Sequence, residues 1–249
     1  MSDYNRGAAR AIPARSTDMS VDAGLRSFML GVYNKVGLGL VLSGALAWLT
    51  SHEPVANFLF KVTADGRFGG YTLPGMIVAF SPLVIILASG FFMRSATPQN
   101  SGALYWTIVS LIGASMGVLL LVYTGMSVAT TFFVTAAAFG GLSLVGYTTK
   151  KDLSGFGTFL IMGMFGLIIA SLVNMFLHAP ILAFAINAIG VLIFAGLIAY
   201  DTQRLKTTYY QLGGDQAAMG VATNYGALSL YLDFINLFQF LLSFLGSRR

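Results

Sequence analysis

The sequence contains no cysteine, so disulfide bonds and thiolate chemistry are excluded. Charged residues make up only 9% of its 249 residues, whereas an ordinary soluble domain is about a quarter charged. The nine acidic residues include a single glutamate, Glu53, and face fourteen lysines and arginines. A chain that is 56% hydrophobic with a net charge of +5 is expected in a lipid bilayer, with anionic headgroups as partners of its basic residues.

Nucleic-acid binding and metalloenzyme activity are not expected either. No basic cluster alternates with aromatic residues. The two histidines, His52 and His178, lie at the ends of hydrophobic stretches, and the sequence has no HExxH motif. Residues 113–117, GASMG, match the GxSxG pattern, but a nucleophile elbow requires a strand, a turn and a helix. We therefore predict no catalytic residues and no cofactor.

Seven hydrophobic stretches are long enough to cross a bilayer. A hydrocarbon core about 30 Å thick requires roughly 20 apolar residues in a helix. No stretch shows the alternation of a barrel strand, so the sequence predicts an all-α integral membrane protein with seven transmembrane helices. A short interfacial piece is expected between the first two spans. The predicted spans are residues 27–50, 74–93, 103–124, 127–148, 155–177, 179–200 and 223–246.

The distribution of lysine and arginine predicts the orientation. With a cytoplasmic N-terminus, the inside segments hold Arg6, Arg10, Arg15, Arg26, Arg94, Lys150, Lys151, Arg204 and Lys206, and the outside segments hold Lys61, Arg67, Arg248 and Arg249. Seven spans then place the C-terminus outside. Arg248 and Arg249 oppose this count, so an arrangement in which the last helix does not cross fully stays open. Lys35, early in the first span, is expected to extend its amine to the cytoplasmic interface.

Residues 1–26 form a polar segment of mixed charge ahead of the first span. They lack the apolar core of a cleavable signal peptide. We predict a disordered cytoplasmic tail at residues 1–26, followed by one transmembrane domain at residues 27–249.

The last span carries a single charge, Asp233, near its middle. A charged side chain at the centre of a lipid-facing helix costs about 2.5–3.5 kcal/mol, so this carboxyl should face the bundle interior and have a partner. The small and polar residues of the span share one narrow face, which we call the polar seam: Gly226, Ser229, Asp233, Asn236 and Ser243. The seam predicts a central helix whose Asp233 faces a cavity that Ser229 and Asn236 help to line.

Asp201 is the second candidate acid. It lies at the predicted cytoplasmic end of the sixth span, where the helix dipole disfavours a carboxylate unless a cation such as Arg204 or Arg94 is near. A solvated aspartate that merely ends the span would explain the same pattern.

The segment GALSLYLDFINLFQFLL, residues 226–242, resembles the signature of the Bax inhibitor-1 (TMBIM) family, in its bacterial YccA- and YetJ-like branch. AYDTQ at 199–203 and TKKDLSGFGTFL at 149–160 resemble the same branch, and the likeness covers nearly the whole chain after residue 25. The resemblance implies six helices wrapped around a central C-terminal helix, in the bacterial inner membrane.

The resemblance also implies a pH-sensitive calcium leak centred on two aspartates that share a proton. Matched motif by motif, these are Asp201 and Asp233, which would contact Ca²⁺ weakly and transiently, while Arg94 matches an arginine that can bind the pair. Two close carboxylates at low dielectric cannot both ionise cheaply, so protons would belong to the pair. Losing the shared proton would loosen the two helices and offer hard oxygens to Ca²⁺. Some relatives carry a glutamate in the second helix; residues 81–93, SPLVIILASGFFM, have none, so a third acidic ligand is missing.

Two other functions stay open. YccA-like relatives are associated with a membrane-bound AAA protease, so the chain could be a non-transporting interaction protein that modulates such a protease through its N-terminal tail. Alternatively, the aspartate pair only fixes the register of two helices.

Overall fold

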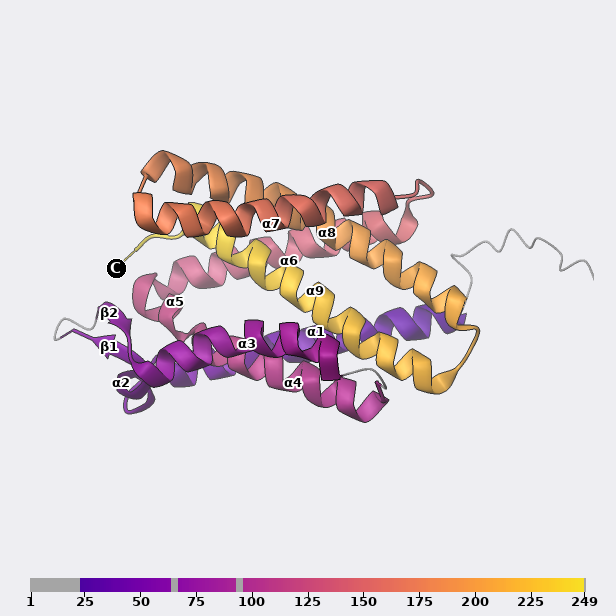
Figure 1. The fold of residues 1–249 in the computed structure, drawn as a ribbon, viewed down its shortest axis with the longest axis horizontal. Helices are drawn as coiled ribbons and strands as arrows, with labels where there is room; N and C mark the ends of the chain where they lie inside the picture. The colour runs from indigo at the N-terminus through magenta and orange to yellow at the C-terminus, as the bar shows by residue number, and fades with distance from the viewer. Residues whose placement is uncertain (1–22, 64–66, 93–95, 249) are drawn as a thin grey trace, which may run out of the picture.

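The computed structural model describes residues 23–63, 67–92 and 96–248. Within these residues, seven helical segments are long and apolar enough to cross a membrane, which confirms the predicted fold class (Figure 1). The described elements are α1 (Ala23–Thr50), α2 (Val55–Leu59), β1 (Phe60–Val62), β2 (Phe68–Tyr71), α3 (Leu73–Phe92), α4 (Pro98–Ser115), α5 (Gly117–Val122), α6 (Gly125–Thr148), α7 (Ser154–Leu177), α8 (Pro180–Leu212) and α9 (Gln216–Leu245).

Polar caps and glycines set the helix boundaries. The Thr97 hydroxyl accepts a hydrogen bond from the backbone N–H of Asn100 at the start of α4. The Asp215 carboxylate accepts bonds from the first N–H groups of α9. Helix α8 ends at Leu212, and the Gly213 that caps it has a φ of 57°, in the left-handed region that glycine adopts without strain. The turn that follows brings α9 back along α8.

Helix α9 is the most buried of the spanning helices. Half of its most apolar stretch is buried, against 11% for α3 and for α7. It packs against α1, α4, α6 and α8, whereas α3 packs against α4 and α7 packs against α8. Apolar side chains on α3 and α7 are widely exposed, as expected for helices that face lipid. The C-terminal helix therefore lies inside the bundle, with α3 and α7 toward its outside.

Helix α8 is longer than the sequence indicates. The span predicted over residues 179–200 continues to Leu212, giving 33 residues. A helix of that length extends about 50 Å, well beyond a hydrocarbon core of about 30 Å. Asp201 thus lies inside the helix rather than at its end. The prediction that terminal carbonyls of this helix surround Asp201 is wrong.

The third predicted span, residues 103–124, consists of two helices. Helix α4 ends at Ser115 and α5 begins at Gly117, with Met116 between them. The backbone N–H of Met116 donates to the carbonyls of both Ile112 (3.0 Å) and Gly113 (3.1 Å), which tightens the chain at this point.

The connection between the first two spans has its own structure. Helix α2 leads into an antiparallel hairpin in which Phe60 pairs with Tyr71. Leu59, Phe60 and Leu121 form a small separate core under the hairpin. This region is more elaborate than the short interfacial piece expected, and it lies at the end of the bundle where α5 ends (Figure 1).

The C-terminal residues are fixed at the same end of the bundle. The carbonyl of Ser247 accepts a hydrogen bond from the N–H of Thr124 (3.0 Å), and the N–H of Ser247 donates to the Ser127 hydroxyl (3.0 Å). The start of α1 lies at the opposite end (Figure 1). Helix α9 therefore runs the full length of the bundle, which argues against the arrangement in which it fails to cross.

Helices α6 and α8 approach closely next to Asp201. A Cβ atom on Gly146 would lie 2.2 Å from the carbonyl oxygen of Ala199, so only glycine fits there. About two turns further along α8, Lys206 Nζ donates to the carbonyl of Tyr147 at 2.6 Å. These two contacts hold α8 against the end of α6.

Candidate functional site

Asp201 and Asp233 lie on neighbouring helices inside the bundle. Helix α8 carries Asp201, helix α9 carries Asp233, and the two helices pack against each other. Only 7% of Asp201 and 6% of Asp233 is exposed. The structure thus brings together the two acids that the sequence singles out, through the α8–α9 turn.

The two carboxyl groups are close enough for their charged forms to repel each other. Ionised carboxylates only accept hydrogen bonds, so a bond between them requires a proton on one. Asp233 Oδ2 is buried without a hydrogen-bond partner among the described residues. If Asp233 were ionised, this oxygen would carry charge that no donor of the described residues stabilises.

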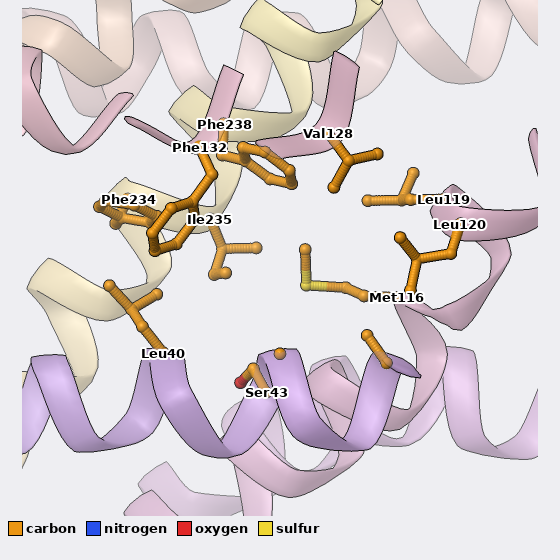
Figure 2. A pocket seen from close by; sticks show the side chains of 12 residues that line it. Leu40, Ser43, Met116, Leu119, Leu120, Val128, Phe132, Phe234, Ile235 and Phe238 are labelled. Atoms are coloured by element: carbon orange, nitrogen blue, oxygen red, sulfur yellow. The ribbon is translucent and has the colours of Figure 1, made fainter. Parts of the chain in front are cut away.

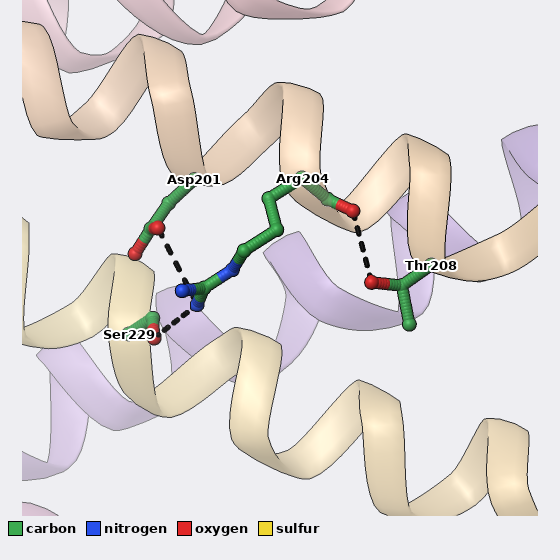
Figure 3. A network of polar contacts seen from close by, with 4 residues as sticks. All are labelled: Asp201, Arg204, Thr208 and Ser229. Carbon is green, nitrogen blue, oxygen red and sulfur yellow. Dashed lines mark hydrogen bonds and ion pairs between the residues drawn. The ribbon is translucent and has the colours of Figure 1, made fainter. Parts of the chain in front are cut away.

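Arg204 and Ser229 lie beside Asp201 (Figure 3). Arg204 Nη2 is 3.3 Å from Asp201 Oδ1 and donates to the Ser229 hydroxyl at 3.1 Å. The same guanidinium thus contacts both Asp201 and Ser229. The Arg204 side chain is 45% exposed, so the guanidinium lies between the buried acids and the surroundings.

Ser243, another residue of the polar seam, also faces α8. Ser243 accepts a hydrogen bond from Asn187 Nδ2 at 2.7 Å. Asn236 differs, because its Nδ2 donates to the carbonyl of Leu232 in its own helix at 2.8 Å. The cavity beside α9 is lined instead by Phe234, Ile235 and other apolar residues, and neither Ser229 nor Asn236 lines it. The polar seam is therefore a helix–helix interface, and the cavity lies on another face of α9.

Residues 25–249 match the protein family described as inhibitor of apoptosis-promoting Bax1. The chain belongs to the Bax inhibitor-1 family. An uncharacterized protein of Caulobacter vibrioides is 68% identical over 249 residues, covering all of both chains. An uncharacterized protein of Rickettsia prowazekii is 42% identical over 250 residues, which again cover the whole of both chains. Inner membrane protein YbhL of Escherichia coli K12 is 41% identical over 91% of this chain and 94% of that protein.

Family membership confirms the resemblance drawn from the terminal motif. Together with the seven helices, it shows a multi-pass membrane protein of the Bax inhibitor-1 family. The relative in E. coli is named as an inner membrane protein.

Arg94, predicted to bind the aspartate pair, lies outside the described residues, as does most of the predicted tail. The cation that the structure places beside the pair in this Bax inhibitor-1 family member is Arg204, three residues after Asp201 on α8. The sequence already named Arg204 as a possible neighbour. A spacing of three residues on a helix was the available signal, because such residues share one face.

The acids near the site are few. Among residues 23–63, 67–92 and 96–248, no group of three or more histidines, aspartates or glutamates comes together. Ca²⁺ prefers about six to eight oxygen ligands. Two carboxyl groups and the Ser229 hydroxyl can contact a passing cation, but they cannot enclose it.

A second polar cluster was missed at the sequence level. Lys35 Nζ donates to Asn224 Oδ1 instead of merely extending to the interface. Asn224 Nδ2 donates to the Ser101 hydroxyl at 2.8 Å, and Tyr105 donates to the carbonyl of Lys35 at 2.6 Å. The cluster joins α1, α4 and α9. The three hydrogen-bonded pairs are 70, 123 and 189 residues apart in the sequence, and no local pattern points to them.

Proposed function

We propose that this protein is a pH-sensitive leak channel for calcium, gated by the Asp201–Asp233 pair. The observation that supports it is the burial of two interacting carboxyl groups on the adjacent helices α8 and α9, with the Arg204 guanidinium beside Asp201. Ca²⁺ and protons are the proposed partners, and no bound cofactor is required.

The proton shared by the pair acts as the closing element. While one carboxyl keeps its proton, the hydrogen bond between Asp201 and Asp233 holds α8 against α9. Two full charges about 4 Å apart repel by about 4 kcal/mol at an effective dielectric constant of about 20. That energy is large compared with a typical interhelical hydrogen bond in a membrane, about 0.6 kcal/mol. Loss of the proton would therefore push the helices apart, and flux should rise with pH.

Arg204 offsets part of this repulsion. Its guanidinium contacts Asp201 and the Ser229 hydroxyl from the exposed side. A cation reaching the pair from that side has to displace the guanidinium. Arg204 would therefore favour loss of the shared proton while competing with Ca²⁺ for the same oxygens.

Flux measurements in liposomes test the proposal. The full-length protein is reconstituted with a calcium-sensitive dye inside, and Ca²⁺ entry is followed from about pH 6 to pH 8, on both sides of neutral, because protons on two close buried carboxyl groups are held more tightly than on an isolated one. Asp201→Asn and Asp233→Asn should each remove the pH dependence, because neither variant retains two ionisable groups. Asp152→Asn is the matched control, since Asp152 is an exposed acid in the α6–α7 connection. It should behave like the wild type.

Persistence of the wild-type pH profile in both site variants would refute gating by the pair. Arg204→Gln adds a second readout with two separable effects. Without the guanidinium, the shared proton should be lost only at higher pH, and the maximal flux should increase because a competitor of Ca²⁺ is gone. An unchanged profile in Arg204→Gln would exclude this role for the guanidinium without excluding the aspartate pair.

A further inference from the structure

An apolar cavity of about 140 Å³ lies beside α9, away from the polar seam. Figure 2 shows side chains from several helices pointing into it. Leu40 comes from α1, Leu119 from α5, Phe132 from α6 and Ile235 from α9. Neither Asp201 nor Asp233 lines this cavity.

The lining excludes water. Ser43 is the only residue with a polar side chain among those that line the cavity. Its hydroxyl is already hydrogen-bonded to the carbonyl of Val109 (3.2 Å) and to the hydroxyl of Tyr231 (2.6 Å). A buried water needs two to four polar partners, whereas apolar cavities of about 150 Å³ stay dry and accept benzene or xenon. The cavity is therefore suited to an apolar group of about that size.

The cavity opens on the outside of the bundle at Gly44. This glycine lines the cavity and is also exposed, and a Cβ atom on it would meet nothing within 4 Å. Val41 on α1 and Phe133 on α6 are neighbours of lining residues, and each is an exposed apolar side chain, at 71% and 70%. The lining residues belong to segments that can span a membrane. Hydrocarbon is thus what surrounds the opening.

We propose that this cavity binds the end of one acyl chain of a membrane lipid, which enters beside Gly44 and packs against Ile235. An apolar guest matches the lining, and lipid acyl chains are the apolar molecules present in bulk around membrane-spanning helices. The guest contacts Phe234 and Ile235, the two residues that follow Asp233 on α9. The binding site itself does not depend on ion conduction.

Photolabelling with a phospholipid that carries a diazirine at the acyl-chain terminus tests this. The full-length protein is reconstituted with the probe, irradiated and digested, and labelled residues are found by mass spectrometry. Met116 and Ile235, which line the cavity, should be labelled. Ile77 on α3, which is 62% exposed, serves as an internal reference for ordinary lipid contact.

Gly44→Phe should fill the opening and abolish the label on Met116 and Ile235 while leaving that on Ile77. Gly37→Phe is the matched control, because Gly37 is an exposed glycine on the same face of α1, with nothing within 4 Å of its Cβ position, and does not line the cavity. It should keep the wild-type labelling. Absence of label in the wild type, or equal label in Gly44→Phe, would overturn the proposal. So would a tightly retained apolar small molecule, or a cross-link to a second copy of the chain, at these residues. None of these outcomes depends on calcium flux.

Discussion

The close contact of α6 with α8 gives a sharp prediction about how Asp201 is positioned. In Gly146→Ala, the new Cβ would lie 2.2 Å from the carbonyl oxygen of Ala199 and 2.9 Å from its Cα. These are backbone atoms, which cannot rotate away as the tip of a side chain can. The helices would have to separate by about 1.2 Å to reach an ordinary contact of 3.4 Å.

The cost of this separation can be estimated. Overpacking a close contact costs typically about 1–3 kcal/mol. For a chain of this size, each kcal/mol shifts the unfolding temperature by about 2–4 °C. If Gly146→Ala lowers the free energy of unfolding by about 2 kcal/mol, the unfolding temperature should fall by about 4–8 °C.

Thermal unfolding of the purified full-length protein in detergent, followed by tryptophan fluorescence, provides the assay. Gly141→Ala is the matched control on the same helix, because Gly141 is exposed and its Cβ position meets nothing within 4 Å. Alanine there should leave stability unchanged or raise it by less than about 1 kcal/mol. Since Asp201 lies two residues after Ala199, Gly146→Ala should also alter the pH profile of calcium flux. Equal unfolding temperatures for the two variants would refute the argument that this glycine sets the position of α8.

Three further predictions concern contacts around the bundle. Asn187 on α8 and Ser243 on α9 share a hydrogen bond of 2.7 Å. A double-mutant cycle with Asn187→Ala and Ser243→Ala should give a coupling energy of about 0.6 kcal/mol in the free energy of unfolding. Strictly additive effects of the two substitutions would contradict this prediction. Lys206→Met should lower the free energy of unfolding by about 1–3 kcal/mol, because the carbonyl of Tyr147 loses its hydrogen-bond donor. An unchanged unfolding temperature would mean that this carbonyl finds another donor. Hydrogen bonds from the Ser154 hydroxyl and backbone lower the pKa of Asp152 below its ordinary value. In Ser154→Ala the pKa of Asp152 should therefore rise toward that value in an NMR titration. An unchanged pKa would mean that the backbone N–H of residue 154 alone lowers it.

The sequence predicts the seven spans well because hydropathy depends on local composition. It misplaces the end of α8, where apolar residues give way to Arg204, Lys206 and several tyrosines although the helix continues to Leu212. Helix propensity and hydropathy are different properties, and polar residues that leave the membrane can extend the same helix. The break at Met116 was also missed, because the stretch around it stays apolar and contains no proline.

The candidate site was predictable in part. The seam periodicity indicated that Asp233 faces inward, and the resemblance of the AYDTQ segment to the family identified Asp201 as its counterpart. Which element the seam faces could not be predicted, because that depends on pairing between distant helices. The sequence placed the seam on a cavity, whereas Ser243 and Ser229 meet Asn187 and Arg204 of α8. For the same reason the contacts of Lys35 with Asn224, and of Gly146 with Ala199, leave no local pattern.

The two faces of α9 connect the proposals. Asp215 caps the start of the helix, and Ser247, just beyond its end, is hydrogen-bonded to Thr124 and Ser127. With both ends held, repulsion between Asp201 and Asp233 can displace only the middle of α9. Close-packed interiors give little room for such a shift, but the cavity lined by Phe234 and Ile235 lies beside that middle segment. A lipid chain in the cavity would occupy the space into which α9 has to move. Occupancy by lipid and calcium flux are therefore expected to oppose each other.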